Sequence, residues 1–249
     1  MKALPRLRTF LFRCRYGFRG VPASVNGAQF RLDESLRRWR LDCEPAVTAV
    51  LQRSLRPGDL MLDLGANFGL HALYAARLVG AEGHVFAFEP VPRNLRLLER
   101  NLRLSQLTDR VTVVPKAVSN APAPFLEMFL PNESVAVVAS LRPVASPGGG
   151  KVRVPNMRLD DFPLPADHPL RLMKVDVEGA ELEVLQGGVT LLRQRKPVLL
   201  VEVHGFALPQ FGSSTAEFDR FLAGLGYRET RLDFRSARDD YYQALFTLA

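Results

Sequence analysis

Cysteine is scarce in this sequence: Cys14 and Cys43 are the only two among 249 residues. Two such cysteines make neither a disulfide framework nor the paired spacing of a zinc site. A reducing compartment suits the chain, and we expect a cytoplasmic protein. Long apolar runs are missing as well, since none approaches the roughly 20 residues that a helix needs to cross a bilayer. This argues against a transmembrane segment.

Acidic residues are absent from positions 1–22, which contain Lys2 and five arginines interleaved with leucine and phenylalanine. Folded as a helix, this segment would be basic and amphipathic, and able to lie on an anionic membrane surface. A docking helix or a frayed basic terminus is the alternative. Its arginines interrupt any apolar core, so it is a poor secretory signal. Peripheral membrane contact through residues 1–22 is therefore one expectation.

Beyond this extension the charge is balanced. The whole chain has a net charge of +7, but residues 1–58 carry 12 basic and 4 acidic residues, and the remainder carries 21 and 22. A nucleic-acid enzyme would carry its basic footprint on the body itself, so we expect no nucleic-acid partner. The length suits one α/β domain with a good core.

A glycine turn follows an apolar run at residues 60–64, which is typical of a parallel strand covered on both faces. Gly65 and Gly69 bracket the turn, and residues 70–78 suit a helix that packs on the sheet. Glycine lets the backbone take unusual angles and lets a ligand come close. Free N–H groups at the helix start favour a polar or anionic part of that ligand.

An acid ends the next predicted strand: Glu89 closes residues 84–89 and lies 24 positions after Gly65. Dinucleotide folds place an acid on the ribose hydroxyls at a spacing of about 20. A carboxylate accepts from two vicinal hydroxyls at once. The turn and the acid together indicate an adenosine-type ligand, and the alternative is an ordinary α/β turn with a solvated glutamate.

The glycine spacing distinguishes between cofactors. Dinucleotide enzymes use G-x-G-x-x-G over a pyrophosphate, whereas Asn67 stands here where the second glycine would be. Asp63 precedes the turn, where an acid repels a pyrophosphate but can serve an amino group. The turn resembles the first motif of class I S-adenosylmethionine-dependent methyltransferases, and its particular sequence resembles that of the FkbM family. The resemblance implies S-adenosyl-L-methionine as the cofactor.

A second motif carries the resemblance further. Lys174, Asp176 and Glu178 alternate, so they share one face of an extended strand. Three buried charges are costly unless they pair or bind something, and open α/β sheets bind ligands at the carboxyl ends of their strands. Together with Gly179 and Glu181, these residues match the motif KxDxEGxE, which is the most diagnostic part of the resemblance to the FkbM family.

Other segments are similar to the family, and the likeness covers about residues 44–249. It implies that Asp63 and the turn backbone hold the methionine part, that Glu89 holds the ribose, and that Asp176 lies beside the sulfonium or amino group. Ala117 and Val118 would line the adenine. The expected cofactor-binding residues are Glu44, Asp63, Gly65, Ala66, Asn67, Gly69, Glu89, Pro90, Ala117, Val118 and Asp176. For Glu44, the alternative is an acid that only favours the start of a helix.

Catalysis is expected of His204, Glu178 and Asp176. Glu202 and His204 share a strand face, and a histidine at a strand tip can take a proton near neutral pH. A hydrogen-bonded structural histidine is the alternative, and Glu178 is the competing base because burial raises a carboxyl pKa. Asp176, Glu202 and His204 are also acceptable metal ligands, although we assign no metal.

The expected fold is α/β: a class I methyltransferase Rossmann-like sandwich with a mostly parallel seven-stranded sheet. The expected strand order is 3-2-1-4-5-7-6, with strand 7 antiparallel. Residues 1–43 would form a basic extension with a small hairpin at 25–32, and residues 44–249 the methyltransferase domain. A β-rich insertion at 119–170, between strands 3 and 4, would extend the sheet and face the substrate.

The expected function is S-adenosylmethionine-dependent methyl transfer, to a hydroxyl oxygen of a sugar, glycolipid, polyketide or other small metabolite. The partner would be a small-molecule or glycoconjugate acceptor. Two alternatives are a nicotinamide-dependent oxidoreductase, against which the glycine spacing argues, and a non-catalytic binding protein on a methyltransferase scaffold, against which the intact acids argue.

Overall fold

The computed structural model describes residues 19–38, 41, 44–130, 140–141, 149–232 and 236–248. Most of the segment 1–22, for which a basic amphipathic helix is predicted, lies outside these residues. Within them, no helix has both the length and the apolar character that a bilayer crossing requires.

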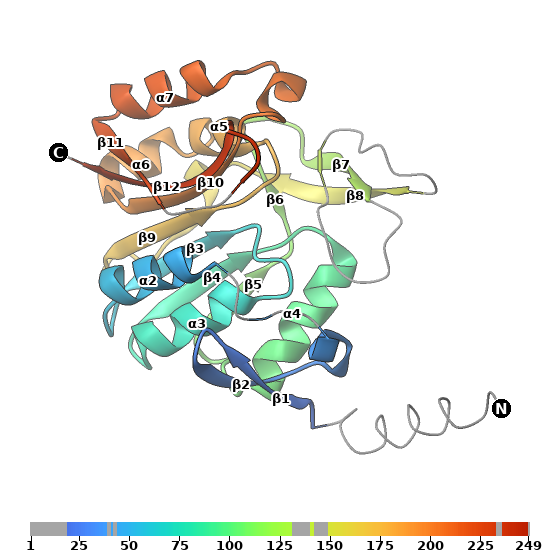
Figure 1. Cartoon of the computed structure of the whole chain (residues 1–249). Coiled ribbons are helices and arrows are strands. Elements are labelled where there is room, and N and C mark those ends of the chain that lie inside the picture. Colours follow the sequence, from blue (N-terminus) through green and yellow to red (C-terminus); the bar gives the residue numbers. More distant parts are fainter. Residues whose placement is uncertain are drawn as a thin grey trace.

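A seven-stranded sheet forms the centre of the molecule (Figure 1). Its order is β11-β12-β10-β9-β3-β4-β5, and β12 runs antiparallel to both of its neighbours. The order predicted from the sequence, 3-2-1-4-5-7-6 with a reversed seventh strand, is confirmed. The strands are β3 (Leu60–Leu64), β4 (His84–Phe88), β5 (Val111–Val114), β9 (Leu170–Val175), β10 (Val198–His204), β11 (Tyr227–Arg231) and β12 (Tyr241–Leu248).

Helices cover both faces of this sheet (Figure 1). One face carries α2 (Pro45–Ser54), α3 (Leu70–Val79) and α4 (Pro92–Leu104), and the other carries α5 (Glu181–Gln186), α6 (Val189–Arg195) and α7 (Thr215–Gly224). Every residue of β3 is buried, because its alternate side chains enter the two cores. Met61 packs with residues of α2, α3 and α4, while Leu62 packs with those of α5, α6 and α7.

The predicted small hairpin is present and begins earlier than expected. It pairs β1 (Val21–Val25) with β2 (Ala28–Leu32), and a short 3-10 helix (Glu34–Arg38) follows. Asn26 and Gly27 form the turn with φ of 45° and 83°, the left-handed pair that suits a two-residue hairpin. The end of the hairpin packs on α4, where the Asp33 backbone N–H donates to Asn101 Oδ1 at 2.8 Å.

The insertion forms its own sheet, with the order β6-β8-β7. Its strands are β6 (Ala117–Val118), β7 (Phe125–Leu130) and β8 (Gly150–Met157). The expectation that these strands extend the central sheet is wrong. Pro115 follows β5 and has no N–H to continue the ladder, and the Lys116 N–H turns back to the Val114 carbonyl oxygen at 2.8 Å. Most of a further strand expected at residues 135–141 lies outside the described residues.

Candidate functional site

A pocket opens where β3, β4 and β9 end, at the edge of the sheet at which open α/β folds bind ligands. Met128 and Leu141 also line it, so the insertion does face the pocket as expected. Of the predicted cofactor residues, those in the wall are Gly65, Asn67, Glu89, Pro90, Ala117, Val118 and Asp176. Glu44, Asp63, Ala66 and Gly69 are not part of the wall.

The two glycines of the turn are required by packing. Gly65 has φ of 86°, and a Cβ there would stand 1.9 Å from the Asp176 carbonyl oxygen. Gly69 has φ of 92°, and its Cβ would stand 2.3 Å from Leu98 Cδ1. The unusual backbone angles expected of these glycines are present, and the close approach of Asp176 and Leu98 is a second reason for glycine. The expected approach of a ligand to the turn stays a prediction. The close contact at Gly65 is what brings the turn and Asp176 to one pocket.

Glu89 holds the turn from the side of β4. Its Oε2 accepts from the Asn67 N–H at 2.8 Å, and its Oε1 accepts from the Val91 N–H at 2.8 Å and from Asn94 Nδ2 at 3.3 Å. Burial raises the pKa of Glu89 to about 7, although these hydrogen bonds oppose the shift. The carboxylate lines the pocket and can accept further hydrogen bonds, as a contact with ribose hydroxyls requires.

The hydrogen-bond acceptors and the apolar wall of the pocket fit an adenosyl ligand. Asn67 lines it, and its buried Oδ1 has no hydrogen-bond partner among the described residues. Phe88, Val118 and Met128 give the same pocket an apolar wall, which suits an adenine ring. Glu89 supplies the acceptor for a diol.

Asp63 is fully buried on β3, and neither of its carboxylate oxygens has a hydrogen-bond partner among the described residues. Burial raises its pKa, and the charge of Lys174 on the neighbouring strand β9 opposes the rise. Its role in holding the methionine part stays a prediction.

Lys174, which is buried, and Asp176, which is partly buried, form an ion pair at the end of β9. Lys174 Nζ donates to Asp176 Oδ2 at 2.8 Å. Burial opposes the charge on the lysine, but the carboxylates of Asp176 and Asp63 raise its pKa. Burial likewise opposes ionisation of Asp176, and Lys174 lowers that pKa. Both groups are therefore charged at neutral pH.

Glu178 does not continue this strand, contrary to the predicted alternation. β9 ends at Val175, and Glu178 stands in a turn with φ of 56°. The turn nevertheless places it in the pocket wall, with Oε2 at 3.2 Å from His204 Nε2. Burial raises the pKa of Glu178 to about 7, while His204 acts to lower it.

His204 ends β10 with both ring nitrogens against carboxylates. Nδ1 lies 2.9 Å from Glu181 Oε1, and Nε2 faces Glu178 and, at 3.8 Å, Glu202 Oε1. Burial acts to lower the pKa of His204, but Glu181 and the neighbouring acids raise it to about 9. The imidazole is therefore protonated at neutral pH, which favours Glu178 as the proton acceptor.

Two residues of β12, Tyr241 and Gln243, also belong to this cluster and were not predicted from the sequence. The Tyr241 hydroxyl donates to Glu202 Oε1, and Gln243 Nε2 donates to Glu202 Oε2 at 3.1 Å and also to Glu44. Antiparallel pairing sets Tyr241 opposite His204 and Gln243 opposite Glu202. A glutamine within a mostly apolar strand was the signal available in the sequence. Glu44 thus belongs to the acid cluster beside the pocket.

Asp176, Glu202 and His204 each present a possible ligand atom, and these atoms lie within 4.8 Å of one another. The three residues named as a possible metal set are therefore brought together. Lys174 already pairs with Asp176, so a metal ion there would share that carboxylate with an ammonium group.

Comparison with known proteins gives concordant matches. The methyltransferase FkbM domain model matches residues 63–229. The hexuronic acid methyltransferase AglP of Haloferax volcanii is 29% identical over 225 residues, which cover 84% of this chain and 85% of that protein. Methyltransferase sdnD of Sordaria araneosa is 30% identical over 161 residues, 54% of this chain and 62% of that protein. The structure of the methyltransferase FkbM from Methylobacillus flagellatus KT shares the fold, with a TM-score of 0.50 at 17% identity, over 83% of this chain and 51% of that chain.

Proposed function

Because this chain belongs to the FkbM methyltransferase family, we propose that it uses S-adenosyl-L-methionine to methylate a hydroxyl oxygen of a sugar. The proposal rests on one observation: Glu89 and Glu178 line the same pocket. Glu89 is placed to accept hydrogen bonds from ribose hydroxyls, and Glu178 to accept a proton. The likeness to a hexuronic acid methyltransferase over most of both chains supports a sugar as acceptor. Family membership favours methyl transfer over the nicotinamide-dependent alternative.

The cofactor would be held by residues that line the pocket. Glu89 would accept from the ribose hydroxyls, and Asn67 Oδ1, which has no partner among the described residues, would accept from a ligand donor. Val118 and Met128 would face the adenine. When bound, S-adenosyl-L-methionine supplies a methyl group that its sulfonium has already activated.

The chain's own chemical task is then to position a hydroxyl and remove its proton. Glu178 lines the pocket, and burial raises its pKa to about 7, so its carboxylate is a competent acceptor at neutral pH. The protonated His204, 3.2 Å from Glu178, would fix the orientation of that carboxylate. Asp176, held by Lys174, would keep negative charge beside the cationic cofactor.

Cofactor binding tests the proposal directly. We expect S-adenosylhomocysteine to bind in isothermal calorimetry and NAD⁺ to give no signal. Glu89→Gln should weaken S-adenosylhomocysteine by about 1–3 kcal/mol, the usual cost of losing a charged hydrogen-bond partner. Glu99→Gln is the matched control, because Glu99 lies exposed on α4 with its carboxylate near Arg103.

Equal affinity in the Glu89 and Glu99 variants would remove Glu89 from the ribose site. Methyl transfer itself is tested by incubating metabolite extract with isotopically labelled S-adenosyl-L-methionine and identifying the labelled product by mass. Cofactor binding without any labelled product would support the non-catalytic alternative.

A further inference from the structure

An exposed aromatic surface lies beside the acid cluster. Phe206 follows β10 by two residues, and 38% of it is exposed. Among the described residues, Phe125 at 45% is the other large apolar side chain with comparable exposure. Phe206 lies next to converging polar groups, and ligand sites combine apolar side chains with a few such groups. We call Phe206 and Tyr241 together the aromatic shelf.

The shelf is continuous with the catalytic groups. The ring centroid of Phe206 lies 5.9 Å from that of His204 and 5.8 Å from that of Tyr241, with edge-to-face geometry in both pairs. The Tyr241 and His204 rings lie 5.1 Å apart. The Tyr241 hydroxyl donates to Glu202, so the shelf is held in place from the carboxylate side. A molecule seated on Phe206 would therefore adjoin the acids around His204.

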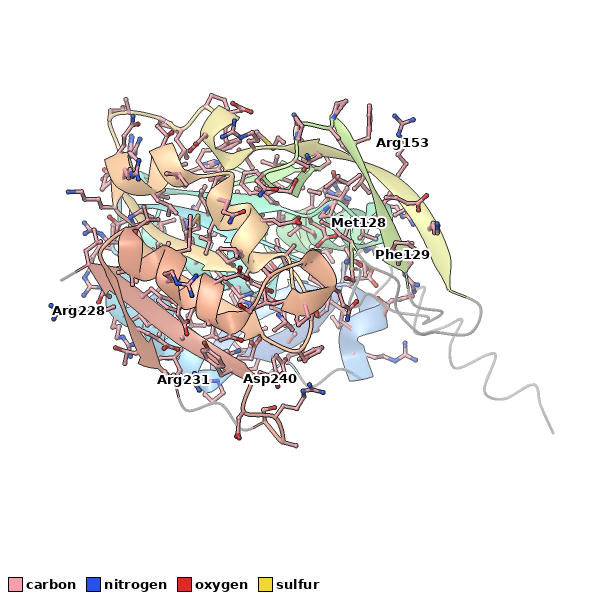
Figure 2. The ribbon with its side chains drawn as sticks, turned by 90° about the horizontal axis from the view of Figure 1, so that it is seen from above. Met128, Phe129, Arg153, Arg228, Arg231 and Asp240 are labelled. Atoms are coloured by element: carbon pink, nitrogen blue, oxygen red, sulfur yellow. The ribbon has the colours of Figure 1, made fainter. Side chains whose placement is uncertain are left out.

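Polar groups rim the shelf. The Arg238 guanidinium lies over the Phe206 ring, 4.7 Å from its centroid, so a ligand would pack on the part of the ring that Arg238 leaves exposed. Asp240 holds this guanidinium through two contacts, Nε to Oδ1 at 3.0 Å and Nη2 to Oδ2 at 3.3 Å. Figure 2 shows Asp240 at the lower edge of the view, where the chain enters β12. The rim offers donors from arginine and acceptors from aspartate, and both suit hydroxyl groups.

We propose that the aromatic shelf is the acceptor subsite and that it binds the pyranose ring of a sugar. The apolar C–H face of the ring packs on Phe206, while the ring hydroxyls reach Glu202 and Glu178 on one side and the Arg238–Asp240 pair on the other. This assignment rests on the proposed function and names the residues that select its acceptor.

The charges around the shelf distinguish a sugar from another flat ligand. A nucleobase also stacks on an exposed aromatic ring. A phosphate beside the shelf would, however, face the carboxylates of Glu178 and Glu202, which repel an anion, while Arg238 is already paired with Asp240. A pyranose ring has no phosphate, and its hydroxyl groups meet the same carboxylates as hydrogen-bond acceptors.

Saturation-transfer NMR with methyl glycosides tests the subsite without knowledge of the natural acceptor. The probes are methyl β-D-glucopyranoside, methyl β-D-galactopyranoside and methyl α-D-mannopyranoside, added to the full-length protein with and without S-adenosylhomocysteine. We expect at least one glycoside to bind. Phe206→Ala should weaken it about tenfold, in line with the loss of one aromatic contact, and Phe206→Tyr should retain it.

Phe125→Ala is the matched control, because Phe125 is also exposed and also lies beneath an arginine, Arg153, at 4.3 Å. Figure 2 shows Arg153 at the upper right, away from Asp240. We expect this variant to bind the glycoside as the native protein does, and both variants to retain S-adenosylhomocysteine affinity, which also shows that they are folded.

The outcomes separate the subsite from the function. Absence of glycoside binding in a protein that binds S-adenosylhomocysteine would overturn the subsite and leave the proposed function standing. Equal glycoside affinity in the Phe206 and Phe125 variants would overturn it as well. Failure of S-adenosylhomocysteine to bind, with a glycoside that depends on Phe206, would overturn the proposed function and leave the sugar subsite standing.

Discussion

Glu178 and His204 lie in contact, and their surroundings decide which of them takes the acceptor's proton. A base must be deprotonated to act. His204 is against Glu181 and Glu178, and its pKa of about 9 leaves it protonated through neutral pH. Burial raises the pKa of Glu178 to about 7, so its carboxylate becomes available as pH rises through that value. We therefore expect methyl transfer to rise with pH near 7.

Substitution of each residue distinguishes the two bases. Glu178→Gln should lower turnover by about 10²–10⁴-fold, the usual contribution of a general base, and remove the rise near pH 7. His204→Ala should keep that rise but move it to higher pH, because the imidazolium charge lowers the pKa of Glu178 and would be lost. The measurement is the pH profile of label transfer to the acceptor found in metabolite extract.

Glu183→Gln is the control, since Glu183 lies on α5 and does not line this pocket. We expect its pH profile to match that of the native protein. If Glu178→Gln kept its turnover, and activity in the native protein rose only near pH 9 and disappeared in His204→Ala, the base would be His204 instead.

For single residues of the site, the sequence predicted their positions better than their protonation states. Gly65, Glu89 and Asp176 could be placed at the pocket because each directly follows a strand of recognisable pattern. The protonation of His204 could not, because it depends on Glu181 and Glu178, which the fold brings to the ring. Gln243 reaches Glu44 across 199 positions, a contact that no local pattern indicates.

The contact between the β3–α3 turn and the end of β9 holds these two elements together at the pocket. Gly65→Ala would place a Cβ 1.9 Å from the Asp176 carbonyl oxygen, at a φ of 86° that alanine also disfavours. Gly58→Ala shares the second cost but not the first, because φ is 89° and no described atom lies within 4 Å of its Cβ. We expect Gly58→Ala to cost about 1 kcal/mol and Gly65→Ala about 2 kcal/mol more.

Denaturant unfolding of both variants measures this difference, and calorimetry with S-adenosylhomocysteine shows whether the pocket is lost with it. Gly65→Ala should weaken the ligand, and Gly58→Ala should not. Equal destabilisation of the two variants would mean that the turn moves away from β9 without cost, and the contact would lose its structural importance.

Element order followed from the sequence because strand and helix periodicities are local, and because the carboxyl ends of the strands carried the motifs. Pairing in the insertion did not follow. β6 directly follows β5 in the chain but pairs with β8, with Ala117 opposite Asn156. This pairing depends on how the chain returns between the two strands, which no local pattern indicates. The prediction that the insertion faces the pocket was correct, and the prediction of its sheet was wrong.

The charge of the whole molecule is divided between an amino-terminal region and a body. Residues 1–58 carry 12 basic and 4 acidic residues, while the remainder is close to neutral with 21 and 22. Among the described residues, those of the pocket and its acid cluster all follow position 43, and we predict that the charge of the first 18 residues is separable from cofactor binding. We propose that the basic residues of this segment bind anionic lipid, as predicted for residues 1–22.

Deletion of residues 1–18 tests that separation. It removes Lys2, Arg6, Arg8, Arg13 and Arg15 and no acidic residue. We expect unchanged affinity for S-adenosylhomocysteine and reduced sedimentation with phosphatidylserine-containing vesicles, since each basic side chain near such a surface contributes about 1 kcal/mol. The loss should be larger at low salt, because ions screen charges over about 10 Å at 0.1 M.

A full-length variant with these five residues changed to glutamine separates the effect of charge from the effect of chain length, and phosphatidylcholine vesicles control for apolar adsorption. If the native chain sediments equally with both kinds of vesicle, the segment does not bind anionic membranes, and a docking helix or a frayed terminus describes it instead.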